Sequence, residues 1–245
     1  MSGVAALSEE AHRLIDEAEN YGIVLRAIGS VAVRLHCEPS SNDMDRRDRV
    51  PKDIDLVTRK RDRRRLDDFF ALRGYETDRD MLVAMEGTRY LFRNQETGID
   101  VDVWVDELNL CHRLDIRHRL GAGPTLPIED LLLSKLQIVE LTDGDIGDIG
   151  CMLTTHQLGQ DADDPEVIDL TYLAGLLGSD WGFWRTATKN MEFLLDRVEP
   201  GARDHLTALL AAVNTAPKSA AWKVRSLIGD RKQWWQDVDI PRDTY

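Results

Sequence analysis

The stretch Lys52-Asp-Ile-Asp-Leu-Val-Thr58 decides the fold class, because acidic and apolar residues alternate along it. Successive side chains of a strand point to opposite faces, so Asp53 and Asp55 would share one face and Ile54 and Leu56 the other. A second stretch, 99–105, alternates in the same way, with acidic Asp100 and Asp102 between apolar residues. We therefore predict two strands that each carry two carboxylates on one face.

A strand, a tight turn and a helix precede this stretch. Residues 23–28 are apolar with one charge and predict a buried strand, Gly29-Ser30 predicts a turn, and 31–37 predicts a short apolar helix. Backbone N–H groups at a helix N-terminus bind phosphate, and glycine lets a phosphate approach without a Cβ in the way. An amphipathic helix from Ser8 to Gly22 opens the chain, and a polar loop, 38–51, leads into the acidic stretch.

The remaining patterns divide the chain in two. A helix over 63–73 and a strand over 88–93 complete the first half. After the break Gly121-Ala-Gly123-Pro124 nearly all of the chain is helical in pattern, with helices expected over 127–142, 165–178, 181–198, 202–213 and 217–236. We predict an α/β (α+β) fold: a mixed sheet core with flanking helices over 1–122, followed by a helical C-terminal region over 123–245.

Composition limits the class of protein. The 245 residues include 31 Lys and Arg against 44 Asp and Glu, a net charge of −13, which argues against strong nonspecific nucleic-acid binding. The run 59–65 is locally basic. It would either bind RNA phosphates or form a solvated helix face. No uncharged stretch is long enough to span a bilayer, and acidic residues at 9 and 10 interrupt any signal peptide. With three widely spaced cysteines, we expect a soluble, cytoplasmic protein with reduced thiols.

The acidic pairs point to metal chemistry. Two carboxylates on one strand face repel each other unless a cation or a proton offsets them, and hard oxygen ligands of this kind suit Mg²⁺. A third carboxylate from the later strand would complete a site for two ions. Either Asp100 or Asp102 could be that ligand; we favour Asp102, which is flanked by two valines. A solvated acidic strand face is the alternative for each pair alone.

In this order the motifs resemble those of nucleotidyltransferases of the DNA polymerase β superfamily: Ile28-Gly29-Ser30, then Asp53-Ile54-Asp55-Leu56, then Val101-Asp102-Val103. Residues 133–138, with Lys135, and Asp145-Ile-Gly-Asp148 are similar to motifs of the bacterial, toxin-type AbiEii and MenT subgroup. The resemblance covers residues 20–150. Two features depart from the family pattern: the gap between Ser30 and Asp53 is about ten residues longer than usual, and the Arg that often precedes the Asp145-Ile-Gly-Asp148 motif is absent.

The resemblance implies an enzyme that moves a nucleoside monophosphate from an NTP to a hydroxyl acceptor, with two Mg²⁺ ions, which Mn²⁺ could replace. The implied catalytic residues are Asp53, Asp55 and Asp102; the implied nucleotide-binding residues are Gly29, Ser30 and Lys135; the implied metal ligands are Asp53, Asp55, Asp102 and Asp100. The toxin-type subgroup further implies a tRNA 3′ end as acceptor and a cognate antitoxin as partner.

Several alternatives stay open at this point. The acceptor could be an antibiotic or metabolite, or a protein, and the fold could serve as a non-catalytic binding module. Lys135 lies in an apolar helix, where a charge needs a phosphate or a partner unless it reaches the surface. Asp145 and Asp148 would then pair with it or cap the next helix.

Overall fold

The computed structural model describes residues 3–37, 53–160, 164 and 166–237. The loop expected over 38–51 lies outside the described residues. The chain forms two compact units, one from 1–108 with 115–131 and one from 109–114 with 132–245. In this division 123–131 belong to the first unit; the predicted domain boundary after residue 122 stays a prediction.

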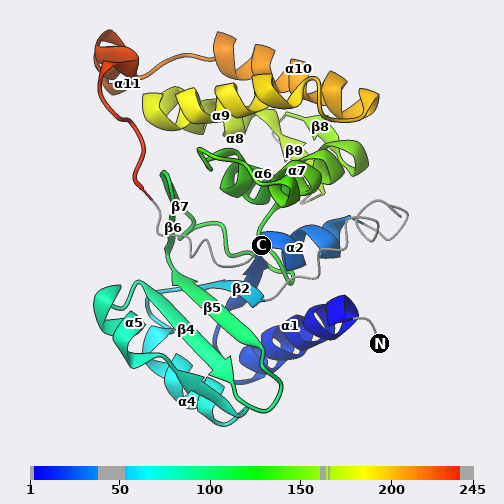
Figure 1. Cartoon of the computed structure of the whole chain (residues 1–245), viewed down its shortest axis with the longest axis vertical. Coiled ribbons are helices and arrows are strands. Elements are labelled where there is room, and N and C mark those ends of the chain that lie inside the picture. Colours follow the sequence, from blue (N-terminus) through cyan, green and yellow to red (C-terminus); the bar gives the residue numbers. More distant parts are fainter. Residues whose placement is uncertain (1–2, 38–52, 161–163, 165, 238–245) are drawn as a thin grey trace. The chain divides into compact units, whose positions relative to one another are not determined.

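A five-stranded mixed sheet forms the centre of the first unit (Figure 1). Its strands follow the order β1 (Leu25–Ile28), β2 (Asp53–Thr58), β5 (Asp100–Val105), β4 (Arg89–Asn94) and β3 (Tyr75–Thr77). Only the β2 and β5 pair is parallel among these neighbours. The predicted fold class, a mixed α/β core with flanking helices and a helical C-terminal region, is confirmed.

One face of this sheet is apolar and carries the core. Ile54, Val103 and Phe92 point to it and are fully buried. Helices α1 (Gly3–Asn20) and α4 (Leu66–Ala71) cover this face. The Phe70 ring of α4 stacks on Phe92 with centroids 4.0 Å apart, and Tyr75 of β3 donates a hydrogen bond to Glu10 of α1. Because the side chains alternate, the opposite face carries the acidic residues.

Shorter elements connect the strands of the first unit. Helix α2 (Gly29–His36) follows β1 directly, a 3-10 turn (Arg63–Arg65) precedes α4, and α5 (Arg79–Ala84) packs against β4. The hairpin of β6 (Glu107–Asn109) and β7 (Arg113–Asp115) and the helix α6 (Ile128–Leu136) contribute residues to both units.

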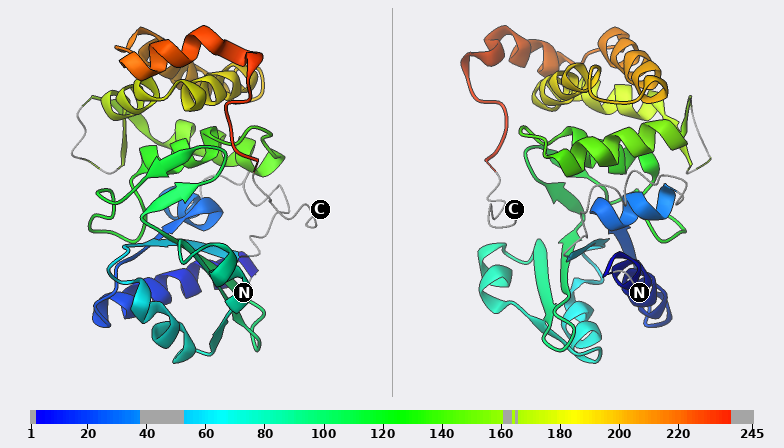
Figure 2. Two further views of the ribbon diagram at one scale, coloured as in Figure 1. Left: turned by 90° about the vertical axis from the view of Figure 1, so that its left-hand side faces the viewer. Right: turned by 45° about the vertical axis from the view of Figure 1, so that its right-hand side comes forward.

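The second unit is largely helical (Figure 2). Its helices are α7 (Asp143–Thr155), α8 (Leu170–Ser179), α9 (Trp181–Leu194), α10 (Pro200–Thr215) and α11 (Ala220–Ile228), with a 3-10 turn over Gly229–Arg231. Helix α10 packs against α7, α8 and α9. Two short parallel strands, β8 (Gln157–Gly159) and β9 (Val167–Asp169), complete it.

Several predicted helix boundaries are wrong. The first helix begins at Gly3, so Ser8 lies inside it and is not its cap. The helix expected from residue 165 begins at Leu170, because the preceding residues pair as β9 and Asp169 caps the helix through the N–H groups of the first turn. The helix expected over 217–236 ends at Ile228, where Gly229 takes a positive φ of 60°.

A membrane crossing needs a helix of sufficient length and apolarity. Among the helices that the structure describes, none meets both requirements.

Candidate functional site

Four aspartates lie on one face of two neighbouring strands. The parallel register of β2 and β5 sets Asp53 beside Asp100 and Asp55 beside Asp102. Adjacent strands are about 4.8 Å apart, so each pair brings two carboxylates close together. Asp102 is only 5% exposed, whereas Asp53 is exposed and the other two are half-buried. The structure thus places all four acidic residues that the sequence singled out on one face of two neighbouring strands.

The turn after β1 adjoins this acidic face. Strand β1 pairs with β2 so that Ile28 lies opposite Asp55, and Gly29 follows with a φ of +66°. A Cβ at position 29 would lie 3.2 Å from the Asp55 Cβ and 3.1 Å from its Cγ, and would overlap its Oδ2. Only glycine fits this position, for its backbone conformation and for its closeness to the Asp55 carboxylate.

Two arginines of β4 reach the same carboxylates, and the sequence analysis missed them. Arg89 Nε donates to both carboxylate oxygens of Asp102, at 2.9 Å each, and Arg89 Nη2 donates to Oδ2. Arg93 pairs with Asp100 at 2.8 and 3.0 Å. The alternation of Arg89, Leu91 and Arg93 with two aromatic residues was the available signal, since it sets both arginines on one strand face.

The charges on this face influence one another. Burial raises the pKa of the Asp102 carboxyl above its ordinary value, Arg89 opposes that shift, and the negative charge of Asp53 adds to it. For Arg89, burial disfavours the charged guanidinium, but the carboxylates of Asp102, Asp55 and Asp53 outweigh burial and raise its pKa. Asp102 and Arg89 therefore influence each other's protonation, and nearby aspartates add to that influence.

The donor set fits a divalent cation. Asp53 and Asp55 place two hard oxygen donors on one strand face, the kind of ligand that Mg²⁺ binds, and like charges at this spacing favour a cation between them. If a divalent ion binds here, these two carboxylates would hold it.

Lys135 and its partners belong to the second unit. Its Nζ lies 2.9 Å from Asp145 Oδ1 and 2.8 Å from Asp148 Oδ2, and its side chain is 15% exposed, so it is not a surface lysine. Burial disfavours the ammonium, but the two carboxylates outweigh it and raise the Lys135 pKa. Asp145 also forms a capping box with Thr142, so both alternatives for this residue, pairing and capping, are realised. A triphosphate contact of Lys135 stays a prediction.

The basic run 59–65 is divided between structural and solvent-facing roles. Arg59 donates to the Leu120 carbonyl oxygen at 2.7 Å, and Arg65 donates to the Gly22 carbonyl oxygen at 2.9 Å. The exposed basic residues of the run are Lys60, Arg61, Arg64 and Arg65, whereas Arg59 and Arg63 are half-buried. Only part of the run is therefore presented to solvent.

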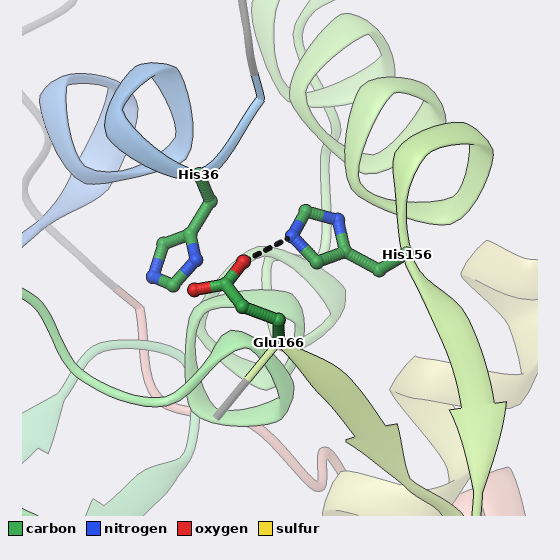
Figure 3. A group of neighbouring side chains, drawn as sticks. All are labelled: His36, His156 and Glu166. Atoms are coloured by element: carbon green, nitrogen blue, oxygen red, sulfur yellow. Dashed lines mark hydrogen bonds and ion pairs between the residues drawn. The ribbon is translucent and has the colours of Figure 1, made fainter. Parts of the chain in front are cut away.

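A histidine of the second unit also carries an acidic partner. His156 Nε2 lies 3.0 Å from Glu166 Oε2, and Figure 3 shows the imidazole facing this carboxylate. His156 is buried and Glu166 is exposed, and the two residues flank the parallel strands β8 and β9. The ion pair thus joins the two residues that directly precede β8 and β9.

No protein-family model and no curated protein matches the chain. Among solved structures, the chain is similar to an antigenic nucleotidyltransferase-like protein from Paracoccidioides brasiliensis, at 16% sequence identity and a TM-score of 0.41. The alignment covers 88% of this chain and 95% of that one. The resemblance to the AbiEii and MenT subgroup stays a prediction.

Proposed function

We propose that this protein transfers a nucleoside monophosphate from an NTP to a hydroxyl acceptor in the presence of Mg²⁺. The observation that carries the proposal is the register of β2 and β5, which aligns Asp55 with Asp102 beside the Gly29 turn. A carboxylate cluster next to a glycine turn at a helix N-terminus combines donors for a cation with N–H groups for phosphate.

Each residue has a role in this proposal. Asp53 and Asp55 would hold the cation, which supplies positive charge at the triphosphate, and the backbone of Gly29 and Ser30 would receive a phosphate. Asp102 would accept the proton of the acceptor hydroxyl. The acceptor oxygen then bonds to the α-phosphorus, the bond from that phosphorus to its bridging oxygen breaks, and pyrophosphate leaves.

A tRNA 3′ end is the acceptor that we propose. The exposed side chains of Lys60, Arg61 and Arg64 support it, because they offer a locally basic surface on an acidic chain. A cognate antitoxin would inhibit a toxin-like enzyme of this kind. If label enters only small molecules and not tRNA, the acceptor is a small cationic compound such as an antibiotic or a metabolite.

A non-catalytic binding module is the second candidate. The pairing of Asp102 with Arg89 and of Asp100 with Arg93 favours it, because two of the four carboxylates already have cationic partners within the protein. Such a module would need no ion at these aspartates.

The deciding experiment measures incorporation of each α-labelled NTP, with Mg²⁺, into total tRNA and into a small-molecule extract. Asp53→Asn removes one ligand charge at nearly constant volume, so transfer is expected to vanish while the fold persists. Asp68→Asn, an exposed aspartate of α4, is the matched control and should transfer normally. Transfer by Asp53→Asn at the wild-type rate would refute the metal assignment. Absence of label everywhere, without any NTP-dependent thermal stabilisation, would favour the binding module.

A further inference from the structure

Arg89 donates hydrogen bonds to both carboxylate oxygens of Asp102. An ionised carboxylate offers about four lone-pair positions. Two N–H groups of Arg89 are directed at them: the Nε–H is shared between both oxygens, and Nη2 donates to Oδ2. Asp102 is the most buried carboxylate of the acidic face, and both of its oxygens accept hydrogen bonds from Arg89.

The Arg89 guanidinium is held from a second side as well. It lies 4.3 Å from the ring centroid of Trp104, which is 8% exposed and opposite Arg89 in the register of β4 and β5. A cation over an indole face is attracted by the ring. Stacking and the hydrogen bonds to Asp102 together fix the guanidinium, whose side chain is 24% exposed.

The second ion pair on this face, Arg93 with Asp100, is more exposed to solvent than the first. Arg93 and Asp100 also form a double hydrogen bond, but their side chains are 60% and 31% exposed. Solvent screens such a pair and lets it exchange partners more readily. The two pairs thus share their chemistry and differ in burial.

Arg89 and Arg93 offset two of the four carboxylate charges on this face, those of Asp102 and Asp100. A second ion at Asp102 would compete with Arg89 for the Asp102 oxygens, whereas one ion at Asp53 and Asp55 leaves the bonds to Arg89 in place.

We propose that Arg89 serves as the fixed counter-ion of Asp102 in place of a second metal ion, so that the site takes up one divalent cation, at Asp53 and Asp55. Arg89 is then a positioning residue, which holds the Asp102 carboxylate toward the acceptor hydroxyl. This inference rests on the proposed function and revises the two ions that the family resemblance implies.

The test counts Mn²⁺ ions in the complex of the full chain with an α,β-methylene NTP, by equilibrium dialysis at pH 8. We expect one Mn²⁺ per bound nucleotide in the wild type. We expect two in Arg89→Gln, because the Asp102 oxygens lose their cation and become ligands. Arg93→Gln is the matched control and should keep a count of one. Arg89→Lys retains the charge, so it should also keep a count of one.

The outcomes separate this inference from the proposed function. Two ions in the wild type, or one ion in a folded Arg89→Gln, would overturn the role of Arg89 and leave nucleotidyl transfer standing. A wild type that binds neither nucleotide nor Mn²⁺ would overturn both. Where transfer is measurable, Arg89→Gln should lower kcat by about 10- to 100-fold with little change in the KM for NTP, as expected when a supporting hydrogen bond is lost.

Discussion

Replacing Gly29 with alanine should damage both stability and the candidate site. The added Cβ meets two obstacles: a φ of +66°, which L-residues rarely adopt, and the Asp55 side chain, whose Cβ and Cγ would lie 3.2 and 3.1 Å away. Carbon atoms in contact normally lie about 3.5 to 4.0 Å apart, so these two atoms of the Asp55 side chain would have to move by roughly 0.3 to 0.9 Å.

The two obstacles contribute separately to the free energy of unfolding. The left-handed conformation costs about 1 to 2 kcal/mol for a residue with a Cβ. Forcing an extra carbon into a packed position costs about 1 to 3 kcal/mol more. We therefore expect Gly29→Ala to lower the free energy of unfolding by about 2 to 5 kcal/mol. A misplacement of about 1 Å at a reacting group also lowers transfer by about 100-fold.

Gly98 provides the matched control for this experiment. It lies in the turn between β4 and β5 with a φ of +71°, and a Cβ there would meet nothing within 4 Å. Gly98→Ala should therefore cost only the conformational part, about 1 to 2 kcal/mol, and leave transfer unchanged. Urea unfolding of the two variants, with thermal shifts by Mg²⁺ and NTP, checks this. Equal losses of stability and equal ligand responses would refute the close approach of Gly29 to Asp55.

Three further predictions concern other parts of the chain. Lys135→Met leaves two partly buried carboxylates without their cation and should lower the free energy of unfolding at pH 7 by about 3 to 5 kcal/mol in urea titrations. Burial lowers the pKa of His112 to about 4, below the roughly 6.5 of an unfolded chain. The unfolded state then binds more protons between these values, so acidification from pH 6.5 to 4 should remove up to about 3 kcal/mol of stability, and His112→Gln should remove that dependence. Arg61→Ser with Arg64→Ser should raise the KM for tRNA and flatten its salt dependence.

Each of these predictions has its own control. Lys223→Met changes an exposed lysine of α11 and should alter the free energy of unfolding by less than about 0.5 kcal/mol. Equal effects of the two lysine variants would contradict the buried ion triad. The same acid dependence in wild type and His112→Gln would assign that proton uptake to another group. An unchanged salt dependence would place the acceptor away from the basic run.

The acidic face was predictable from the sequence because a strand has a period of two. That period alone places Asp53 with Asp55 and Asp100 with Asp102, and the apolar residues between them mark both strands as buried. Gly29 was predictable as a turn, yet its closeness to Asp55 was not, because it depends on the pairing of β1 with β2.

The arginine partners and the short strands could not be predicted in the same way. The pairing of Arg89 with Asp102 depends on the register of the antiparallel strands β4 and β5, which the alternation within each strand does not fix. Strands of three residues, such as β8 and β9, carry too little alternation to be distinguished from a helix start. The preference for Asp102 as ligand stays a prediction, although burial and the Arg89 pair now distinguish it from Asp100.

The register of β2 and β5 also bears on how the chain finds its fold. These parallel neighbours are separated in the sequence by the 3-10 turn, α4, β3, α5 and β4, so their pairing is a long-range contact, of the kind that slows folding. A slip of β5 by one residue would turn Asp100 and Asp102 into the apolar layer formed by Phe70 and Phe92, where unpaired charges are very costly. Intermediates with the wrong register should therefore dissociate quickly. In this way the aspartates would favour the native register of β2 and β5 during folding.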